Sequence, residues 1–187
     1  YTQIYDKCLP SMVSIEAISS STYSTGTGIV VTSDGYIVTN AHVVAGASQV
    51  RVILWDNEVL DASLVGFDAE EDLAVLKIEA EGLTPAEFGD SSSLRIGDPV
   101  AALGDPLGYR STITDGIISA LDREVEVDGV TMVLIQTSAA INFGNSGGAL
   151  INSYGQVVGV TTIKIVTDDG SAEALGFAIP STRVKYV

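Results

Sequence analysis

Short segments in which apolar and polar residues alternate run along most of the chain. They are rich in Val, Ile, Thr and aromatic residues and end at Asp, Asn, Gly or Pro, the pattern of strands and turns. We predict a first series of strands at Met12–Ile18, Gly28–Thr32, Tyr36–Thr39, Gln49–Trp55, Val59–Phe67 and Leu73–Ile78. A second series is predicted at Pro99–Leu103, Ser111–Ala120, Glu124–Val127, Thr131–Thr137, Ala149–Ile151, Gln156–Val166 and Gly176–Ile179. Strands this short and this evenly spaced favour an all-β sandwich or barrels.

Only the ends of the chain favour helices. Residues Thr2–Leu9 predict a short helix that Pro10 stops, and Pro180 begins a second helix. Ser19–Thr25 is rich in Ser and Thr and is predicted as a loop, while Glu79–Arg95 has no clear period and is predicted to connect two halves.

Composition narrows the classes of function. Within 187 residues, 24 Asp and Glu outnumber 9 Lys and Arg, for a net charge of −15. An acidic surface repels phosphates and anionic lipids, so nucleic-acid binding is disfavoured. The apolar runs are too short to cross a bilayer. Cys8 is the only cysteine, which excludes an intrachain disulfide and a cysteine-based zinc site.

The stretch Gly144-Asn145-Ser146-Gly147-Gly148 carries the candidate chemistry. Its glycines allow a tight turn that pushes the Ser146 hydroxyl outward and leaves backbone N–H groups free for an oxyanion. By itself, the pattern fits a glycine-rich hairpin loop with a solvated serine equally well.

A serine nucleophile needs a base, and His42 is the only histidine in the chain. Because it precedes Ser146, the order excludes an α/β-hydrolase, in which the histidine follows the nucleophile. Two acids are candidates for orienting the base: Asp34, which already has a role in a predicted Asp-Gly hairpin turn, and Asp72, which enters a predicted strand. Asp72 gives the order His, Asp, Ser on an all-β chain and is favoured.

Several stretches, taken in order, resemble the protease domain of the HtrA (Deg) family. They are Gly26-Thr27-Gly28, Thr39-Asn40-Ala41-His42-Val43-Val44, Asp72-Leu73-Ala74-Val75-Leu76-Lys77, Gln136-Thr137-Ser138-Ala139-Ala140-Ile141-Asn142, Gly144-Asn145-Ser146-Gly147-Gly148 and Gly176-Phe177-Ala178-Ile179-Pro180. This resemblance implies two perpendicular six-stranded antiparallel barrels of chymotrypsin type: a barrel at about 11–80, a connection at about 81–97, a barrel at about 98–180 and a truncated helix at 181–187. It also implies that a PDZ domain follows in the full-length protein.

The same resemblance assigns roles in the site. It implies His42 as general base, Asp72 as its orienting acid and Ser146 as nucleophile, with the N–H groups of Gly144 and Ser146 as oxyanion hole and no cofactor or metal. Phe143 and Ala149 stand where the family commonly has proline. We expect the peptide after Gly144 to flip more freely, so that the unliganded domain has an unformed oxyanion hole.

Ala140 lies six positions before Ser146, where relatives that cut after Lys or Arg carry an aspartate. With Ile141, Phe143 and Ile163 it is predicted to line an apolar pocket for Val, Ala or Ile.

The resemblance implies an ATP-independent serine endopeptidase of protein quality control, acting on unfolded or damaged proteins. It implies an extracytoplasmic protein, anchored or exported in full length, and a trimer built through an N-terminal segment in which Tyr1 and Tyr5 are the candidates. The alternative is a chaperone-like binding module with little proteolysis.

Overall fold

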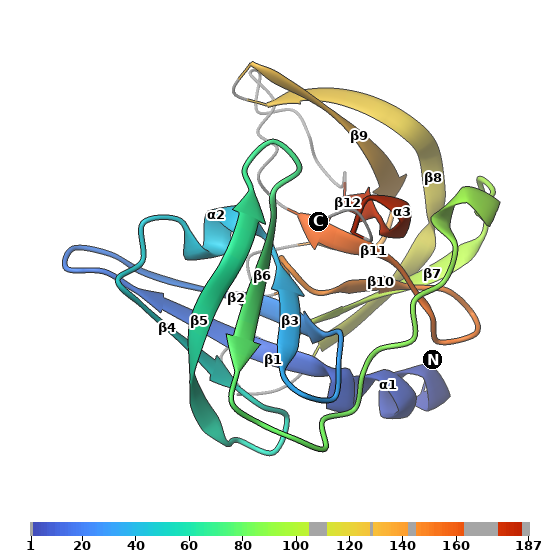
Figure 1. Cartoon of the computed structure of the whole chain (residues 1–187). Helices are drawn as coiled ribbons and strands as arrows, with labels where there is room; N and C mark the ends of the chain where they lie inside the picture. Colours follow the sequence, from blue (N-terminus) through green and yellow to red (C-terminus); the bar gives the residue numbers. More distant parts are fainter. Residues whose placement is uncertain (1, 105–111, 128, 142–144, 163–175, 185–187) are drawn as a thin grey trace.

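The computed structural model describes residues 2–104, 112–127, 129–141, 145–162 and 176–184. Their strands form two closed barrels of six strands each (Figure 1), so the predicted all-β fold is confirmed. The first barrel has the order β1-β2-β3-β6-β5-β4, and the second β10-β11-β12-β9-β8-β7, with antiparallel neighbours throughout. The strands of the first barrel are β1 (Met12–Ile18), β2 (Tyr23–Val30), β3 (Tyr36–Thr39), β4 (Gln49–Ile53), β5 (Val59–Asp68) and β6 (Leu73–Ile78). Those of the second are β7 (Pro99–Gly104), β8 (Thr112–Val127), β9 (Val130–Thr137), β10 (Ala149–Ile151), β11 (Val157–Thr162) and β12 (Gly176–Pro180).

Each barrel is filled by inward-facing side chains, and a further apolar cluster joins the two barrels. Ile15, Ile37 and Leu76 are buried inside the first barrel, and Ile118 and Leu150 inside the second. The joining cluster takes Met12, Ile29, Val38 and Leu73 from the first barrel and Leu103, Ala149 and Val160 from the second. A shared core of this kind fixes the two barrels against each other, and with them any site formed between them.

Two strand predictions were wrong in detail. The loop predicted at Ser19–Thr25 ends early, because β2 begins at Tyr23 and pairs with Ile18 of β1. Tyr and Thr are strong strand formers, and an available partner strand outweighed the loop-like composition. The segments Ser111–Ala120 and Glu124–Val127 belong to one strand, β8, in which register shifts on either side of Ala120 bulge the chain instead of ending it.

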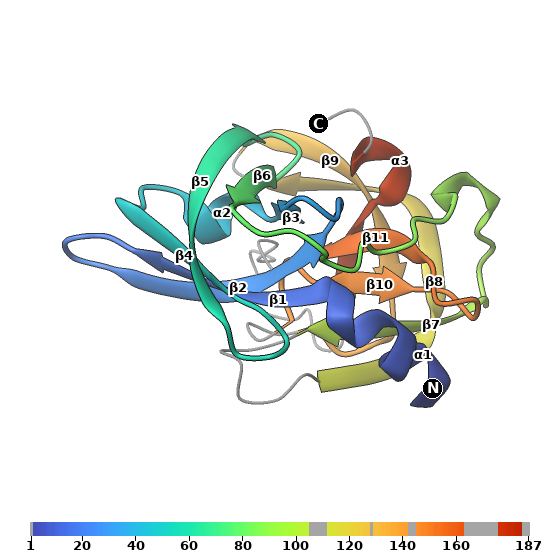
Figure 2. The same ribbon diagram turned by 60° about the horizontal axis from the view of Figure 1, so that its bottom comes forward.

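The predicted N-terminal helix is present as α1 (Thr2–Cys8), followed by the 3₁₀ turn η1 (Leu9–Ser11). Although α1 leads into the first barrel, it packs beside the second (Figure 2). The Lys7 Nζ lies 2.8 Å from Glu87 Oε2 and donates to the Tyr154 carbonyl at 3.0 Å, while the Cys8 Sγ donates to the Gly155 carbonyl at 3.4 Å. Burial raises the pKa of the Cys8 thiol, as expected for a packed side chain rather than a reactive one.

Residues 79–98 connect the barrels and contain the turn η2 (Ser91–Ser93). The C-terminal helix α3 (Ser181–Val184) begins directly after Pro180, as predicted, and Ser181 donates to the Gly89 carbonyl at 2.9 Å. Within the described part of the chain, no helix has the length and apolar character needed to cross a membrane.

Candidate active site

His42 and Asp72 are brought together by one pair of neighbouring strands. Thr39 at the end of β3 pairs with Ala74 near the start of β6, so the residues just beyond each of them lie side by side. His42 sits on α2 (Ala41–Val44), a single helical turn that follows β3. Its Nδ1 lies 2.8 Å from Asp72 Oδ2, and its backbone N–H donates to Asp72 Oδ1 at 2.9 Å. The sequence-predicted pair is therefore in direct contact.

Asp72, directly before β6, is fixed by hydrogen bonds to its side chain and its backbone. It is fully buried and has a φ of 55°, a left-handed backbone conformation that residues other than glycine rarely adopt. The hydroxyl of Thr162 on β11 donates to Oδ2 at 3.0 Å, and the Ala41 N–H donates to the Asp72 carbonyl at 3.1 Å. Strained backbone persists where surrounding contacts fix it, which is common in active sites.

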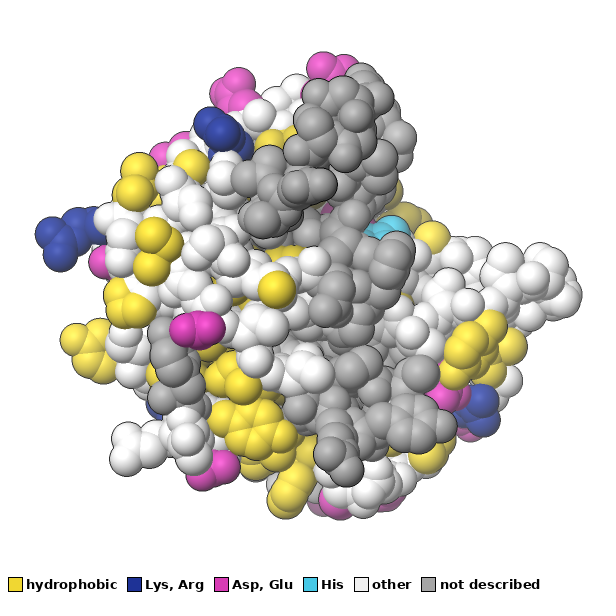
Figure 3. Space-filling view, turned by 180° about the vertical axis from the view of Figure 1, so that it is seen from behind, with side chains coloured by type: hydrophobic (Ala, Val, Ile, Leu, Met, Phe, Trp, Pro, Cys, Tyr) yellow, Lys and Arg dark blue, Asp and Glu magenta, His cyan; other side chains and the backbone are white. Residues whose placement is uncertain are grey.

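The contact with Asp72 also fixes which imidazole nitrogen is basic. An ionised carboxylate only accepts hydrogen bonds, so the proton of neutral His42 lies on Nδ1 and the lone pair on Nε2. The side chain of Asp72 has no exposed surface, whereas that of His42 is 27% exposed. Figure 3 shows the single histidine of the chain reaching the surface of the molecule. This arrangement presents a base to incoming molecules and keeps its orienting acid away from water.

Ser146 lies on a turn that only glycine can form. Gly147 has a φ of +86°, and a Cβ on it would lie 2.2 Å from the Thr27 carbonyl oxygen. A Cβ on Gly148 would lie 2.2 Å from the Leu103 carbonyl oxygen. The Thr27 N–H donates to the Ser146 carbonyl at 2.9 Å, and a Cβ on Gly26 would press on Val43. Gly26 and the Thr27 N–H therefore let β2 of the first barrel approach the turn of the second, while Gly28 makes room for Ile15 and Ile37 inside the first barrel.

Of the two N–H groups predicted to form the oxyanion hole, that of Ser146 lies in the described part of the chain. The Gly147 and Gly148 N–H groups donate to the Thr161 and Asn145 carbonyls at 2.9 and 3.0 Å. Within the described part of the chain, the Ser146 N–H makes no hydrogen bond, as a donor to an oxyanion requires. Gly144 and Phe143, and with them the expected freedom of this loop, lie outside the described residues.

The hydroxyl of Ser146 points to a partner that sequence reasoning missed. Its Oγ donates to Oδ1 of Asn40 at 2.8 Å. Asn40, fully buried, donates in turn from Nδ2 to the Asp72 carbonyl at 3.3 Å. Three hydrogen bonds thus connect Ser146 to His42 through Asn40 and Asp72. Asn40 stood two positions before the only histidine, but its chain position gave no sign that it would face a serine of the other barrel.

The residues predicted to line the specificity pocket are partly described. Ala140 is exposed, and its carbonyl accepts hydrogen bonds from Thr114 Oγ1 at 2.9 Å and Asn145 Nδ2 at 3.0 Å. Ile141 is half-buried and lies against Gly176. A Cβ added to Gly176 would lie 2.7 Å from the Cγ1 of Ile141. Gly176 therefore belongs to this wall, a role that its place in a predicted strand did not indicate. Phe143 and Ile163 lie outside the described residues.

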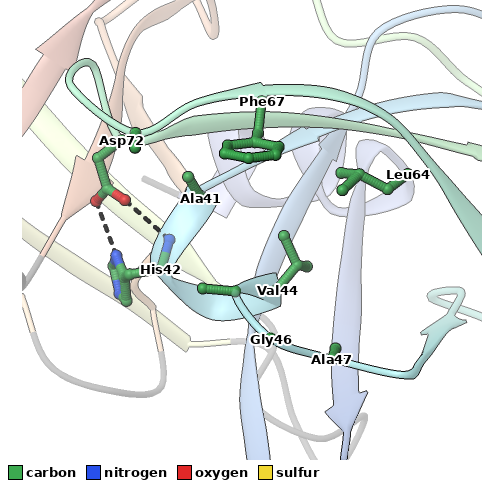
Figure 4. A pocket seen from close by; sticks show the side chains of 10 residues that line it. Ala41, His42, Val44, Gly46, Ala47, Leu64, Phe67 and Asp72 are labelled. Carbon is green, nitrogen blue, oxygen red and sulfur yellow. Dashed lines mark hydrogen bonds and ion pairs between the residues drawn. The ribbon is translucent and has the colours of Figure 1, made fainter.

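A hollow opens beside the histidine (Figure 4). It has a volume of about 320 Å³ and lies between α2 and β5. His42, Val44, Ala47, Leu64, Phe67 and Asp72 line it. Leu64 and Phe67 are 47% and 64% exposed, which is high for large apolar side chains. The surface next to the base is thus suited to an apolar group.

The described residues contain no group of three or more His, Cys, Asp or Glu side chains arranged to hold a metal ion. What they offer is a buried carboxylate, an oriented imidazole and a serine on a tight glycine turn, the groups used in acyl transfer.

Comparison with known proteins agrees with this geometry. Residues 26–160 match the family described as trypsin-like peptidase domain. The chain is 49% identical over 172 residues to the serine protease Do-like HtrA of Lactobacillus helveticus, an alignment covering 87% of this chain and 42% of that protein. It is 48% identical over 166 residues to a Chlamydia trachomatis protein named "Probable periplasmic serine endoprotease DegP-like", covering 87% of this chain and 32% of that one.

Among solved structures, the HtrA-type protease AlgW with tripeptide matches with a TM-score of 0.90 and 39% identity, over 100% of this chain and 62% of that chain. The chain thus spans less than half of the two curated relatives. The chain belongs to the trypsin-like peptidase family and, within it, to the HtrA serine proteases.

Proposed function

We propose that this domain is a serine endopeptidase in which Ser146 is the nucleophile, His42 the general base and Asp72 the acid that orients it. One observation carries the proposal: the buried Asp72 carboxylate holds His42 Nδ1 at 2.8 Å and so leaves Nε2 as the base. An imidazole held in this tautomer serves proton transfer from a hydroxyl. The names of the relatives also favour an enzyme over a chaperone-like binding module.

In the proposed reaction, Ser146 Oγ attacks the carbonyl carbon of the scissile peptide as its proton passes to His42 Nε2. The tetrahedral oxyanion accepts hydrogen bonds from the N–H groups of Gly144 and Ser146, and losing one such donor costs about 3 kcal/mol of transition-state stabilisation. His42 then gives the proton to the leaving amine. Water then attacks the acyl-enzyme as His42 Nε2 takes its proton, and His42 returns that proton to Ser146 Oγ as the acid product leaves. No cofactor or metal takes part.

The proposed substrates are unfolded or damaged protein segments, cut without ATP after small or medium aliphatic residues such as Val, Ala or Ile. Ala140 offers no carboxylate to a Lys or Arg side chain, and the neighbouring Ile141 is apolar. The apolar hollow beside His42 favours a substrate with hydrophobic residues around the cleaved bond. Folded proteins bury such residues, so unfolded chains are the natural source.

We also propose where the protein acts and how it assembles. The Chlamydia relative and others carry "periplasmic" in their names, which supports an extracytoplasmic location. We infer a homotrimer built through the N-terminal segment. Of the two tyrosines expected to contribute, Tyr5 is half-buried beside the joining cluster and Tyr1 lies outside the described residues. A monomer in analytical ultracentrifugation would refute the trimer.

Labelling with a fluorophosphonate, which reacts with activated serines, tests the enzyme. We expect the protein to be labelled, Ser146→Ala to abolish labelling and His42→Ala to lower its rate by at least 10³-fold. Ser153→Ala, which removes an exposed serine on a surface turn, is the control and should react like the parent. Labelling that persists in Ser146→Ala would contradict the proposal.

A further inference from the structure

Asn40 occupies a position where an asparagine usually caps a helix, yet it does not cap. It precedes the first residue of α2 with extended dihedrals, φ −78° and ψ 141°, and makes no side-chain hydrogen bond to the helix. Its side chain is nevertheless fully buried. Burial of an amide is costly unless both ends are bonded, so the side chain requires another explanation.

The bonds at the two ends of the amide fix its orientation. Its neighbour on one side is the Asp72 carbonyl oxygen, which only accepts, so the donating Nδ2 must face it, at 3.3 Å. The acceptor Oδ1 therefore faces Ser146, whose hydroxyl donates at 2.8 Å. A hydroxyl has one proton, and here the proton points to Asn40 instead of His42.

The bond acts on the hydroxyl and is not needed to place the Ser146 backbone. That backbone is tied to β2 by the hydrogen bond from Thr27 N–H to the Ser146 carbonyl, and the following residue is tied to Thr161. The Asp72 carbonyl likewise keeps the Ala41 N–H as donor if Nδ2 is removed. Both neighbours of the Asn40 amide thus have independent support.

We propose that Asn40 is a positioning residue that holds the Ser146 hydroxyl in a resting orientation, away from the base. Attack requires Ser146 to exchange its hydrogen bond to Asn40 Oδ1 for one to His42 Nε2. Substrate binding must favour that exchange, so Asn40 restrains the basal reactivity of the site. This inference rests on the proposed role of Ser146 as nucleophile and adds a restraint that the triad itself does not contain.

The test compares fluorophosphonate labelling rates, without peptide, of the parent protein and Asn40→Leu, which has similar volume and no hydrogen-bonding group. A buried neutral hydrogen bond is worth roughly tenfold in an equilibrium, so we expect labelling to be up to tenfold faster. The pH midpoint of labelling should not move, because the base is unchanged. A merely structural role predicts slower labelling with a displaced midpoint.

Thr39→Val is the matched control, since it removes a buried hydrogen bond of 2.8 Å to the Thr27 carbonyl one position earlier. If Thr39→Val labels faster as well, general loosening explains the effect and the proposal fails. Unchanged or slower labelling of Asn40→Leu also overturns it. If Ser146→Ala labels like the parent, the proposed nucleophile is wrong instead.

Should Asn40→Leu not fold, judged by circular dichroism, Asn40→Ala removes the same bond with a smaller side chain. A crystal structure of the unliganded parent decides the matter independently of any variant. Ser146 Oγ within hydrogen-bonding distance of Asn40 Oδ1 supports the proposal, whereas Oγ bonded to His42 Nε2 overturns it.

Discussion

The base and its acid are assembled by one barrel, whereas the nucleophile is assembled by two. His42 and Asp72 both follow from the pairing of β3 with β6 in the first barrel. The turn around Ser146 contacts β2 of the first barrel as well as β7 and β11 of the second. The acid–base pair is therefore positioned by the register of one strand pair, with a hydrogen bond from Thr162 of the second barrel added to Asp72, whereas the nucleophile depends on how the two barrels dock.

This difference predicts two kinds of sensitivity. Changes at the acid–base pair should alter chemistry more than stability, because the carboxylate and imidazole act on the reacting proton. Changes at the nucleophile turn should alter both, because the turn is also part of the packing between the barrels. Pairs of variants, one at the acid–base pair and one at the nucleophile turn, test this difference.

The largest effect is expected at Asp72. Asp72→Asn replaces an acceptor by an amide that can donate to His42 Nδ1, so the imidazole proton moves to Nε2 and the base is lost. Such a change lowers kcat by about 10⁴-fold in serine proteases with this triad. Steady-state cleavage of a peptide with Val before the cleaved bond measures kcat, and urea unfolding measures stability.

The control for Asp72→Asn is Asp68→Asn, four residues earlier, at the end of β5. Asp68 accepts hydrogen bonds from the Glu70 and Glu71 N–H groups and does not touch the histidine. Its replacement should leave kcat within a few-fold of the parent. A loss of kcat of less than tenfold in Asp72→Asn would contradict the prediction, since Asp72 would then not be orienting the base.

The next effect is expected at Gly147. Gly147→Ala places a Cβ 2.2 Å from the Thr27 carbonyl oxygen at a φ of +86°, so the turn must move. We expect at least 10²-fold slower labelling of Ser146 and a free energy of unfolding lower by about 3 kcal/mol.

Gly46→Ala separates backbone strain from the clash. Gly46 has a similar φ of +72°, but no atom lies within 4 Å of the added Cβ. Left-handed strain alone costs about 1 kcal/mol, so this variant should be mildly destabilised and label at nearly the parent rate. Equal losses in both variants would show that the close approach to Thr27 is unimportant.

Sequence reasoning predicts most where local chemistry decides the structure. Alternating patterns located the strands, the tight glycine turn singled out Ser146, and the single histidine with the chain order selected Asp72. These inferences need only the period of a strand, the conformations open to glycine and the requirement for a base. The structure places Asp72 and His42 in direct contact accordingly.

Sequence reasoning did not predict contacts between residues far apart in the chain. Asn40, between β3 and α2, reaches Ser146, and Thr162 on β11 reaches Asp72, and neither position has a local signature. The apolar hollow beside His42 likewise depends on how β5 curves over α2. Such features depend on barrel closure and docking, which no single segment encodes.

The smallest effect separates two adjacent threonines on β11. Thr162 donates to Asp72 Oδ2 at 3.0 Å, while Thr161 donates to the Asn145 carbonyl at 2.6 Å. Thr162→Val and Thr161→Val each remove a buried hydroxyl and its hydrogen bonding with little change of side-chain shape, so each should lower the free energy of unfolding by about 1 kcal/mol. Only Thr162→Val acts on the acid, and we expect it to lower kcat about tenfold.

Proton NMR distinguishes the two threonine variants without reference to activity. Because the chain has one histidine, its Nδ1–H signal is unambiguous. Thr162→Val should move that signal, since the carboxylate bonded to Nδ1 loses a donor. Thr161→Val should leave it in place while loosening the Ser146 turn. If both variants move it, the two halves of the site are coupled through β11, and the contrast between one barrel and two must be given up.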